Sequence, residues 1–142
     1  MSEQNKEIAL RFVKAMSTND PEGAAATLAP DAITNTKGYS KFAARRPASA
    51  VVAAIESFKG LFPNGLGLTI HTVVAEGDKV VIEGDGHAVM ADGNPYENQY
   101  CFVITLRDGK IVEINEYLCS ALAEKVLLPV VEKLGNVEVI GS

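Results

Sequence analysis

The feature of this sequence that most constrains its fold is a change of hydrophobic period at Gly67. Before Gly67, apolar residues recur every three or four positions, as in "IALRFVKAM"; after it, they alternate with polar residues. The first spacing is typical of a helix with one buried face, and the second of a strand with one buried face. Asp-Gly pairs separate the alternating runs, as in "ADGNP" and "RDGK", and such pairs predict β-hairpins. The sequence therefore predicts helices first and an antiparallel meander after them.

The first half of the chain contains three predicted helices. The first covers about residues 3–17. A short second helix has Asn19 or Asp20 as its N-cap and Pro21 at its first position, and Pro30 closes it. "DAITNT" is predicted to be a short strand and "KGYSKFAARRP" a loop. Pro47 opens the third helix, which "PNGLG" ends.

The second half contains four predicted strands, at about residues 68–76, 79–91, 96–107 and 111–118. The tail has helical spacing until Pro129, which must bend or end it. This order predicts one α+β domain over residues 1–142, with helices packed on a single curved sheet.

Composition excludes several classes of function. The formal net charge is −5, which argues against nucleic-acid binding, because phosphate contacts need an excess of Lys and Arg. No apolar run approaches the roughly 20 residues that cross a bilayer, and the amphipathic start does not resemble a signal peptide, so we expect a cytoplasmic protein without membrane contact. The two cysteines and two histidines are scattered, and we expect neither a metal site nor a cofactor.

Strand pairing predicts which side chains share a face. A three-residue turn at "RDGK", with Gly109 as a left-handed bulge residue, places Phe102 and Ile104 beside Val112, Ile114, Glu116 and Leu118. A strict two-residue turn at Asp108-Gly109 would instead move Glu116 to the other face. A tight "DG" turn or a four-residue "DGNP" turn in the preceding hairpin adds Asp85 and His87, with Asn98 and Tyr100, to the face of Phe102. Under these turns, one face carries an apolar band and a polar cluster that contains Glu116.

The opposite face then consists of small or apolar residues, namely Ile82, Gly84, Gly86, Ala88, Cys101 and Val103. Such a face favours burial against a second copy of the sheet, and we expect a homodimer through it.

The chain resembles the nuclear-transport-factor-2-like superfamily, in its SnoaL-like or ketosteroid-isomerase-related branch. The resemblance lies in "IALRFVKAMSTNDPEGAAATLAPDA" at the start and "EGDGHAVMADGNPYENQYCFVITLRDGKIVEINEYL" towards the end. It implies a cone-shaped α+β barrel, in which a strongly curved, mainly antiparallel sheet wraps three N-terminal helices around a pocket. It also implies a dimer through the convex face. Because this fold hosts isomerases, epoxide hydrolases, dehydratases, cyclases and binding proteins, function has to be argued from the site.

Two catalytic sets of similar proteins are missing here. The Tyr and two Asp residues of steroid isomerases correspond to Phe12, Thr36 and Phe102, none of which abstracts a proton. The Arg-x-Asp pair of limonene-type epoxide hydrolases falls near Gly84 and Gly86, and only its last-strand acid is retained, as Glu116. Cys119 stands where many similar proteins carry a further acid, and it lacks a basic neighbour that could activate it.

The remaining polar residues predict an acid–base site. We expect Glu116 to move a proton, His87 to be its counterpart, and Tyr100 with Asn98 to hold the developing oxyanion. The open alternative for Glu116 and His87 is a structural role in which each is bonded to a neighbour. The other predicted substrate-binding residues are Asp85, Phe102, Ile114, Leu118, Tyr39, Phe12, Met16, Phe58 and Phe62. The expected substrate is a small, apolar molecule bearing a carbonyl or epoxide group, and the alternative is a binding protein without catalysis.

Overall fold

The computed structural model describes residues 2–134. Three helices belong to the first half of the chain: α1 (Ser2–Ser17), α2 (Pro21–Ala25) and α3 (Ala48–Leu61). The strands are β1 (Leu28–Thr36), β2 (Ala44–Pro47), β3 (Thr69–Glu76), β4 (Lys79–Asp85), β5 (Ala88–Val89), β6 (Pro95–Tyr96), β7 (Gln99–Arg107) and β8 (Lys110–Leu118). A helical segment follows β8, consisting of α4 (Ser120–Leu122), a π-helical turn (Ala123–Leu127) and α5 (Leu128–Leu134).

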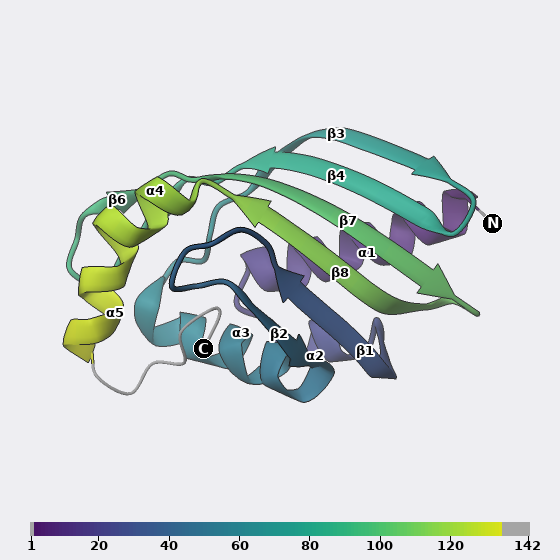
Figure 1. Cartoon of the computed structure of the whole chain (residues 1–142), viewed down its shortest axis with the longest axis horizontal. Helices are drawn as coiled ribbons and strands as arrows, with labels where there is room; N and C mark the ends of the chain where they lie inside the picture. Colours follow the sequence, from purple (N-terminus) through teal and green to yellow (C-terminus); the bar gives the residue numbers. More distant parts are fainter. Residues whose placement is uncertain (1, 135–142) are drawn as a thin grey trace.

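Six of the strands form one curved sheet in the order β2-β1-β8-β7-β4-β3 (Figure 1). The β1–β8 pair is parallel and the other pairs are antiparallel, so the predicted, mainly antiparallel α+β architecture is confirmed. Helix α1 packs against β3, β4 and β8, and α3 packs against β1 and β2. In Figure 1 the segment that contains α4 and α5 lies at the end of the sheet where β6 is also found. The sheet thus covers the helices on one side, and the C-terminal segment covers one end.

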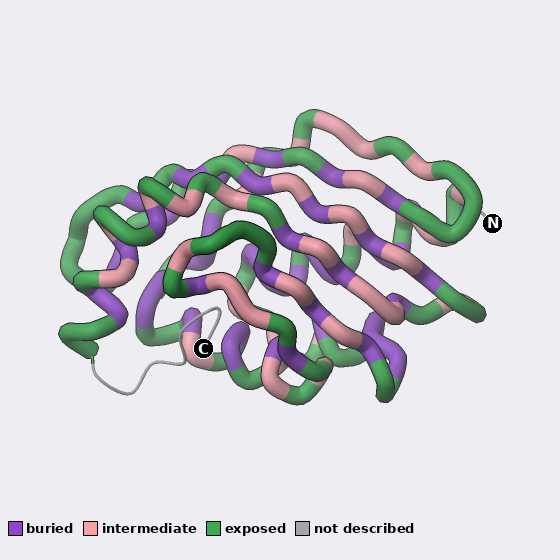
Figure 2. The backbone as a smooth tube through the Cα atoms, viewed as in Figure 1, coloured by how far each residue is buried: buried purple, intermediate pink, exposed green. Residues whose placement is uncertain are grey.

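Figure 2 shows buried and more exposed residues alternating along the central strands. Ile82, Phe102 and Ile114 are almost fully buried on the inner face of the sheet, whereas their strand neighbours Val103 and Asn115 are only partly buried. This alternation is expected of a sheet with one face on the core and the other towards solvent. None of the helices in residues 2–134 has the length and hydropathy needed to span a membrane.

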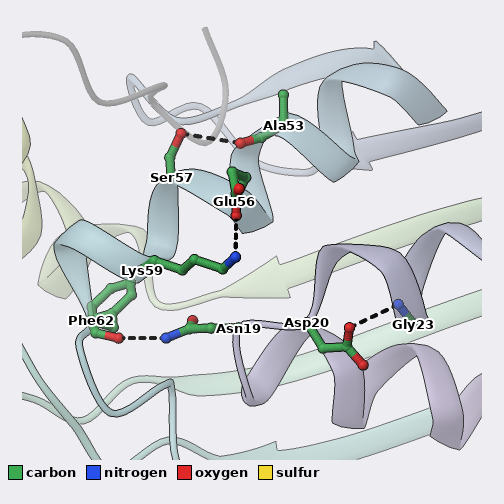
Figure 3. Close-up of polar contacts among 8 residues, drawn as sticks. All are labelled: Asn19, Asp20, Gly23, Ala53, Glu56, Ser57, Lys59 and Phe62. Carbon is green, nitrogen blue, oxygen red and sulfur yellow. Dashed lines mark hydrogen bonds and ion pairs between the residues drawn. The ribbon is translucent and has the colours of Figure 1, made fainter.

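Polar contacts link the α1–α2 turn to the end of α3 (Figure 3). The Asp20 carboxylate accepts a hydrogen bond from the Gly23 backbone N–H at 2.9 Å, which confirms Asp20 as the N-cap of α2. Asn19 has a φ of 57°, and its Nδ2 donates to the Phe62 carbonyl at 2.8 Å. Because Phe62 is fully buried, this bond helps to fix an aromatic side chain in the core.

Two boundaries of the early elements differ from the sequence prediction. Helix α2 ends at Ala25, and Pro30 lies inside β1 rather than closing a helix. The β1–β8 register shifts between Leu28 and Ile33, and such an irregularity accommodates a proline that has no N–H for the ladder. The predicted loop after β1 contains β2, whose residues Ala44–Pro47 pair with β1. A strand of this length is too short for its alternation to stand out in the sequence.

Pro129 does not end the C-terminal helical segment. It lies in the first turn of α5, immediately after the π-helical turn. Proline removes one backbone donor and crowds the preceding turn, and a π-helical turn is one way in which a helix accommodates such a disturbance. The segment therefore continues far enough to bury Leu127, Val130 and Val131 against the rest of the protein.

The connection between β4 and β7 corrects a predicted face. Five residues, Met90 to Asn94, separate the paired residues Val89 and Pro95, whereas the prediction assumed a two- or four-residue turn. An odd number of loop residues pairs even positions with even ones, so Ile82 lies opposite Phe102, and Gly84 opposite Tyr100. The prediction that Asp85 and His87 share the face of Phe102 is therefore wrong.

The same correction changes the predicted dimer face. Ile82, Gly84 and Ala88 are buried, and only Cys101 and Val103 of the six predicted residues lie on the outer face as expected. Gly86 is also buried, and a Cβ atom there would lie 3.0 Å from Cε1 of Tyr100. Its missing side chain makes room for the tyrosine ring.

Glu116 faces inward for a different reason from the one predicted. The β7–β8 turn contains two residues, Asp108 and Gly109, both with positive φ (52° and 77°), as in a type I′ turn. Alone, this turn would place Glu116 on the outer face. A bulge follows, however, because Leu106 pairs with Ile111 whereas Thr105 pairs with Glu113, which leaves one extra residue on β8. The bulge reverses the alternation, so that Ile111 replaces Val112 on the inner face and Glu116 pairs with Phe102 as predicted.

Candidate functional site

A cavity lies between the inner face of the sheet, helices α1 and α3, and the C-terminal segment. It is lined mainly by apolar side chains, with Glu116, Arg46 and Thr34 among the few polar ones. The space available to the centres of water molecules is about 40 Å³, and roughly 10–15 Å³ suffices for one water. The cavity as it stands therefore holds a few waters, and a larger ligand has to displace some of the side chains around it.

Nine of the predicted site residues line this cavity. They come from α1, α3, the segment after α3, β7 and β8, and they are Phe12, Met16, Phe58, Phe62, Tyr100, Phe102, Ile114, Glu116 and Leu118. Two stacked aromatic pairs stiffen the wall: Tyr100 on Phe102, with ring centroids 6.0 Å apart, and Tyr96 on Phe62, at 5.8 Å.

Glu116 is the carboxylate of the cavity. Its exposed fraction is 8%, and its Oε1 accepts a hydrogen bond of 3.5 Å from the Thr36 hydroxyl, which lies opposite it on β1. Burial raises its pKa from 4.5 to about 7, although the charge of Arg46 and the hydrogen bond from Thr36 act in the opposite direction. At neutral pH the protonated and ionised forms are therefore both well populated.

Arg46 is a further site residue, and it belongs to the segment "KGYSKFAARRP" that was predicted to be a loop. It lies on β2 opposite Thr34. On the same face of the sheet, the next row of paired residues is Ala44, Thr36 and Glu116. Its exposed fraction is 7%, while that of its neighbour Arg45 puts it among the exposed residues. The sequence contained a signal for this residue: in a strand "ARRP", neighbouring side chains point to opposite faces, so only one of the two arginines can face the core.

We expect the substitution Arg46→Met to raise the pKa of Glu116 above about 7. The guanidinium charge favours the ionised carboxylate, and methionine keeps a similar apolar stem without the charge. Titration of the 13C-labelled Glu116 carboxyl by NMR measures the effect. Arg45→Met is the matched control, because Arg45 is exposed on the same strand and should leave this pKa unchanged.

Tyr100 and Tyr96 bring two phenol groups to the cavity. Burial raises the pKa of Tyr96 to about 12 and that of Tyr100 well above its usual value of 10, and the nearby charge of Glu116 adds to both shifts. Both side chains therefore remain protonated across the physiological range and are available as hydrogen-bond donors. Tyr96 was not among the predicted site residues, because it belongs to a two-residue strand inside a segment expected to be one long hairpin.

Asn98 is buried, but its polar atoms are used within the protein. Its Nδ2 donates to the Tyr96 hydroxyl at 2.7 Å and to the Cys119 carbonyl at 3.1 Å. Its Oδ1 accepts from the backbone N–H groups of Cys119 at 3.0 Å and Gln99 at 2.7 Å. Asn98 thus anchors the point where β8 passes into the C-terminal segment, and it does not line the cavity as predicted.

His87, Asp85 and Tyr39 lie away from the residues that line the cavity. His87 is exposed, and its Nδ1 lies 3.2 Å from Oε2 of Glu97. Asp85 is on the outer face, where its Oδ1 accepts from Gln99 Nε2 at 3.4 Å. Tyr39 is fully exposed beside a separate surface hollow near Tyr117 and Ser120. The five-residue loop of the β5–β6 hairpin is the reason for the first two differences, since it reverses the parity of β4.

No group of three or more His, Cys, Asp or Glu side chains within residues 2–134 is arranged to hold a metal ion. Cys119 is exposed, and its described hydrogen bonds are made by its backbone, with Asn98 and with the Ala123 N–H. The polar groups that line the cavity are one carboxyl group, one guanidinium group, two phenols and the Thr34 hydroxyl.

Comparison with known proteins agrees with this architecture. The family model of the SnoaL-like domain matches residues 9–114, which is most of the chain. The chain belongs to the SnoaL-like domain family. This family is part of the nuclear-transport-factor-2-like superfamily, so the resemblance found in the sequence is confirmed. A search of curated proteins found no match.

Solved structures with the fold of the SnoaL-like family cover nearly the whole chain. PrhC from Penicillium brasilianum has a TM-score of 0.78 at 18% identity, with 94% of this chain and 91% of that chain covered. An NTF2-like protein of unknown function from Burkholderia pseudomallei has a TM-score of 0.76 at 17% identity, with 90% and 99% covered. An LEH-like epoxide hydrolase of M. tuberculosis has a TM-score of 0.73 at 21% identity, with 94% and 96% covered. At these identities the similarity establishes the fold.

Proposed function

We propose that this protein is a cofactor-independent acid–base enzyme acting on a small, largely apolar molecule that bears a carbonyl or epoxide group, polyketide-like compounds included. The observation that supports this most directly is Glu116, a buried carboxyl group with a pKa of about 7 in an otherwise apolar cavity. A general base or acid works best when its pKa lies near the operating pH. A structural carboxylate in the core gains nothing from such a pKa and costs stability at neutral pH.

The proposed chemistry for a carbonyl substrate moves one proton. Ionised Glu116 takes a proton from the carbon next to the carbonyl. The electron pair of that C–H bond forms a C=C bond, and the π pair of the carbonyl moves to its oxygen to give the enolate. Protonated Glu116 then returns the proton to a carbon of the enolate, which gives an isomer or the starting compound. With an epoxide, the same carboxylate would take a proton from the attacking water while a donor in the cavity protonates the ring oxygen.

The direct test is α-proton exchange of acetophenone in D2O, followed by NMR. We expect the protein to accelerate the exchange, with a rate that rises with pH up to about 7 as Glu116 ionises. Glu116→Gln should lower the rate by roughly 10²–10⁴-fold, because general-base catalysis contributes about that much. A parallel assay of styrene oxide hydrolysis tests the epoxide branch.

Glu113→Gln is the matched control. Glu113 lies on the same strand and accepts a hydrogen bond from Asn35 Nδ2 at 3.1 Å, but it does not line the cavity. Its substitution should leave both rates unchanged. Equal rates for the wild type and Glu116→Gln in both assays would contradict the assignment of Glu116 as the acid–base group.

The second candidate is a binding protein of the same fold without catalysis. It is favoured by the absence of the catalytic sets of steroid isomerases and limonene-type epoxide hydrolases, since Phe12, Thr36 and Phe102 and the glycines at 84 and 86 replace them. Native mass spectrometry of the purified protein separates the two candidates. A ligand that stays bound unchanged to both the wild type and Glu116→Gln favours binding, whereas a ligand retained in its unreacted form only by Glu116→Gln favours catalysis.

Association into a homodimer through the convex face and a cytoplasmic location stay predictions. The outer face carries the partly exposed Val74 and Tyr117 besides Cys101 and Val103. Its polar residues, such as Asn35 and Asn115, are hydrogen-bonded to each other at 2.8 Å.

A further inference from the structure

The hydrogen-bond donor for a ligand in this cavity can be identified by counting the hydrogens that each polar side chain donates and the partners that already accept them. Three polar side chains in and between β6 and β7 are candidates: Tyr96 and Tyr100 line the cavity, and Asn98 is hydrogen-bonded to Tyr96 behind it. Each of these side chains carries a hydrogen-bond donor that suits a ligand oxygen. Their contacts with one another distinguish their roles.

Asn98 has no hydrogen left for a ligand. Its amide carries two N–H groups, and these are directed at the Tyr96 hydroxyl and the Cys119 carbonyl. Both N–H groups that approach its carbonyl oxygen belong to the backbone. Asn98 is therefore a positioning residue, which holds the Tyr96 hydroxyl in place.

Tyr96 keeps its own proton for another group. An amide N–H can only donate, so the Tyr96 oxygen accepts at 2.7 Å from Asn98, and its O–H must point elsewhere. Burial raises the pKa of Tyr96 to about 12, so its O–H keeps its proton and is available to a ligand.

Tyr96 lies in the wall of the cavity and brings its hydroxyl group there. Its side chain lines the cavity together with Glu116 and Tyr100, and its ring is held parallel to Phe62, at an interplanar angle of 17°. The Glu116 and Tyr96 side chains thus border the same cavity. A ligand between them is in contact with a base on one side and a donor on the other.

We propose that the Tyr96 hydroxyl is the group that binds the carbonyl oxygen of the substrate and stabilises the enolate oxygen, with Asn98 as its positioning residue. This inference rests on the proposed function for the enolate step, but not for carbonyl binding itself. Tyr96 keeps its proton throughout: when Glu116 removes the α-proton and the electron pair moves to the oxygen, the hydrogen bond from Tyr96 shortens and strengthens. The ligand class that fits is a neutral, apolar ketone or thioester, since the cavity is lined mainly by apolar side chains.

The test is the infrared C=O stretch of 13C-labelled acetophenone bound to the protein. A hydrogen bond from Tyr96 should move this band below its position in an apolar solvent. In Tyr96→Phe the band should return to the apolar-solvent position, and the exchange rate in D2O should fall by roughly 10²-fold or more. Phenylalanine keeps the ring that stacks on Phe62, and near-ultraviolet circular dichroism verifies the fold.

Three further variants make the outcome decisive. Tyr39→Phe, outside the cavity, should change neither readout. Tyr100→Phe should keep most of the band shift, because Tyr96 still donates. Glu116→Gln should lose exchange but keep the shift, so a failure of the acid–base proposal is distinguishable from a failure of this one. A shift that survives in Tyr96→Phe, one that disappears only in Tyr100→Phe, or a wild type that does not bind the ketone would overturn the inference.

Discussion

Glu116→Gln should stabilise the protein by up to about 3 kcal/mol above pH 7, although it removes the proposed catalytic group. The folded-state pKa of Glu116 is about 7, against 4.5 for an unperturbed glutamate. This difference corresponds to about 3 kcal/mol, at roughly 1.4 kcal/mol for each pKa unit. Glutamine has a similar shape and no charge to bury, so the variant avoids that penalty.

The pH dependence of the free energy of unfolding follows from the protonation of Glu116 in the folded and the unfolded state. Below pH 4.5 Glu116 is protonated in both states, and the wild type and the variant should differ little. Between pH 4.5 and about 7 the folded state holds the proton more tightly than the unfolded state, so the wild type loses stability as the pH rises. Above about 7 the carboxylate is ionised in both states, and the difference is constant.

Urea denaturation from pH 4 to 8 measures this difference. Glu113→Gln is again the control, because Glu113 is only partly buried on the outer side of the same strand. A free-energy difference between the wild type and Glu116→Gln that does not change with pH would contradict the raised pKa. Gain of stability with loss of activity is the behaviour expected of a group kept for function.

Asn98→Ala should destabilise the fold by about 3 kcal/mol or more. The side chain makes four hydrogen bonds at a site with 1% exposure. Alanine leaves the Tyr96 hydroxyl and the part-buried N–H of Cys119 without this partner, whereas the Cys119 carbonyl still accepts from the Ala123 N–H. Each unsatisfied buried group costs about 1–3 kcal/mol. Because Cys119 is where β8 passes into α4, the C-terminal segment should loosen first.

Urea denaturation measures the total loss, and amide hydrogen exchange shows where it occurs. Exchange should be fastest relative to the wild type in residues 119–131. Asn94→Ala is the matched control, since Asn94 is an exposed residue of the β5–β6 loop whose side chain donates only to Asp92 among the contacts described. If Asn98→Ala lowers the free energy of unfolding no more than Asn94→Ala does, the four hydrogen bonds of Asn98 contribute little to stability in solution.

The elements of this fold were largely predictable because their signals are local. Helix periodicity, the Asp20 cap and alternation depend on neighbours a few positions apart, and α1, α3, β3 and β8 were found within one or two residues of their predicted bounds. β2 and the split of the long hairpin were missed. Elements this short contain too few residues for a period to be recognised.

The site was predictable only in part, because the face on which a strand residue lies depends on loop lengths and bulges as well as on alternation. Glu116 was assigned to the inner face on the basis of a three-residue turn, but the turn has two residues and the bulge at Val112 restores the face. His87 was assigned to that face by the same kind of argument and lies outside. One additional residue in a loop or strand reverses every side chain beyond it.

By itself, the sequence determined the α+β class, the family and the apolar lining of the cavity, because these follow from composition and from patterns repeated over many residues. Only the tertiary structure decided which polar groups meet there. Arg46 and Tyr96 approach Glu116 through strand pairs far apart in the chain, and Asn98 is excluded because its hydrogen bonds are already used. Burial and strand pairing, which raise the pKa of Glu116 and determine its neighbours, are properties of the folded chain and not of any segment.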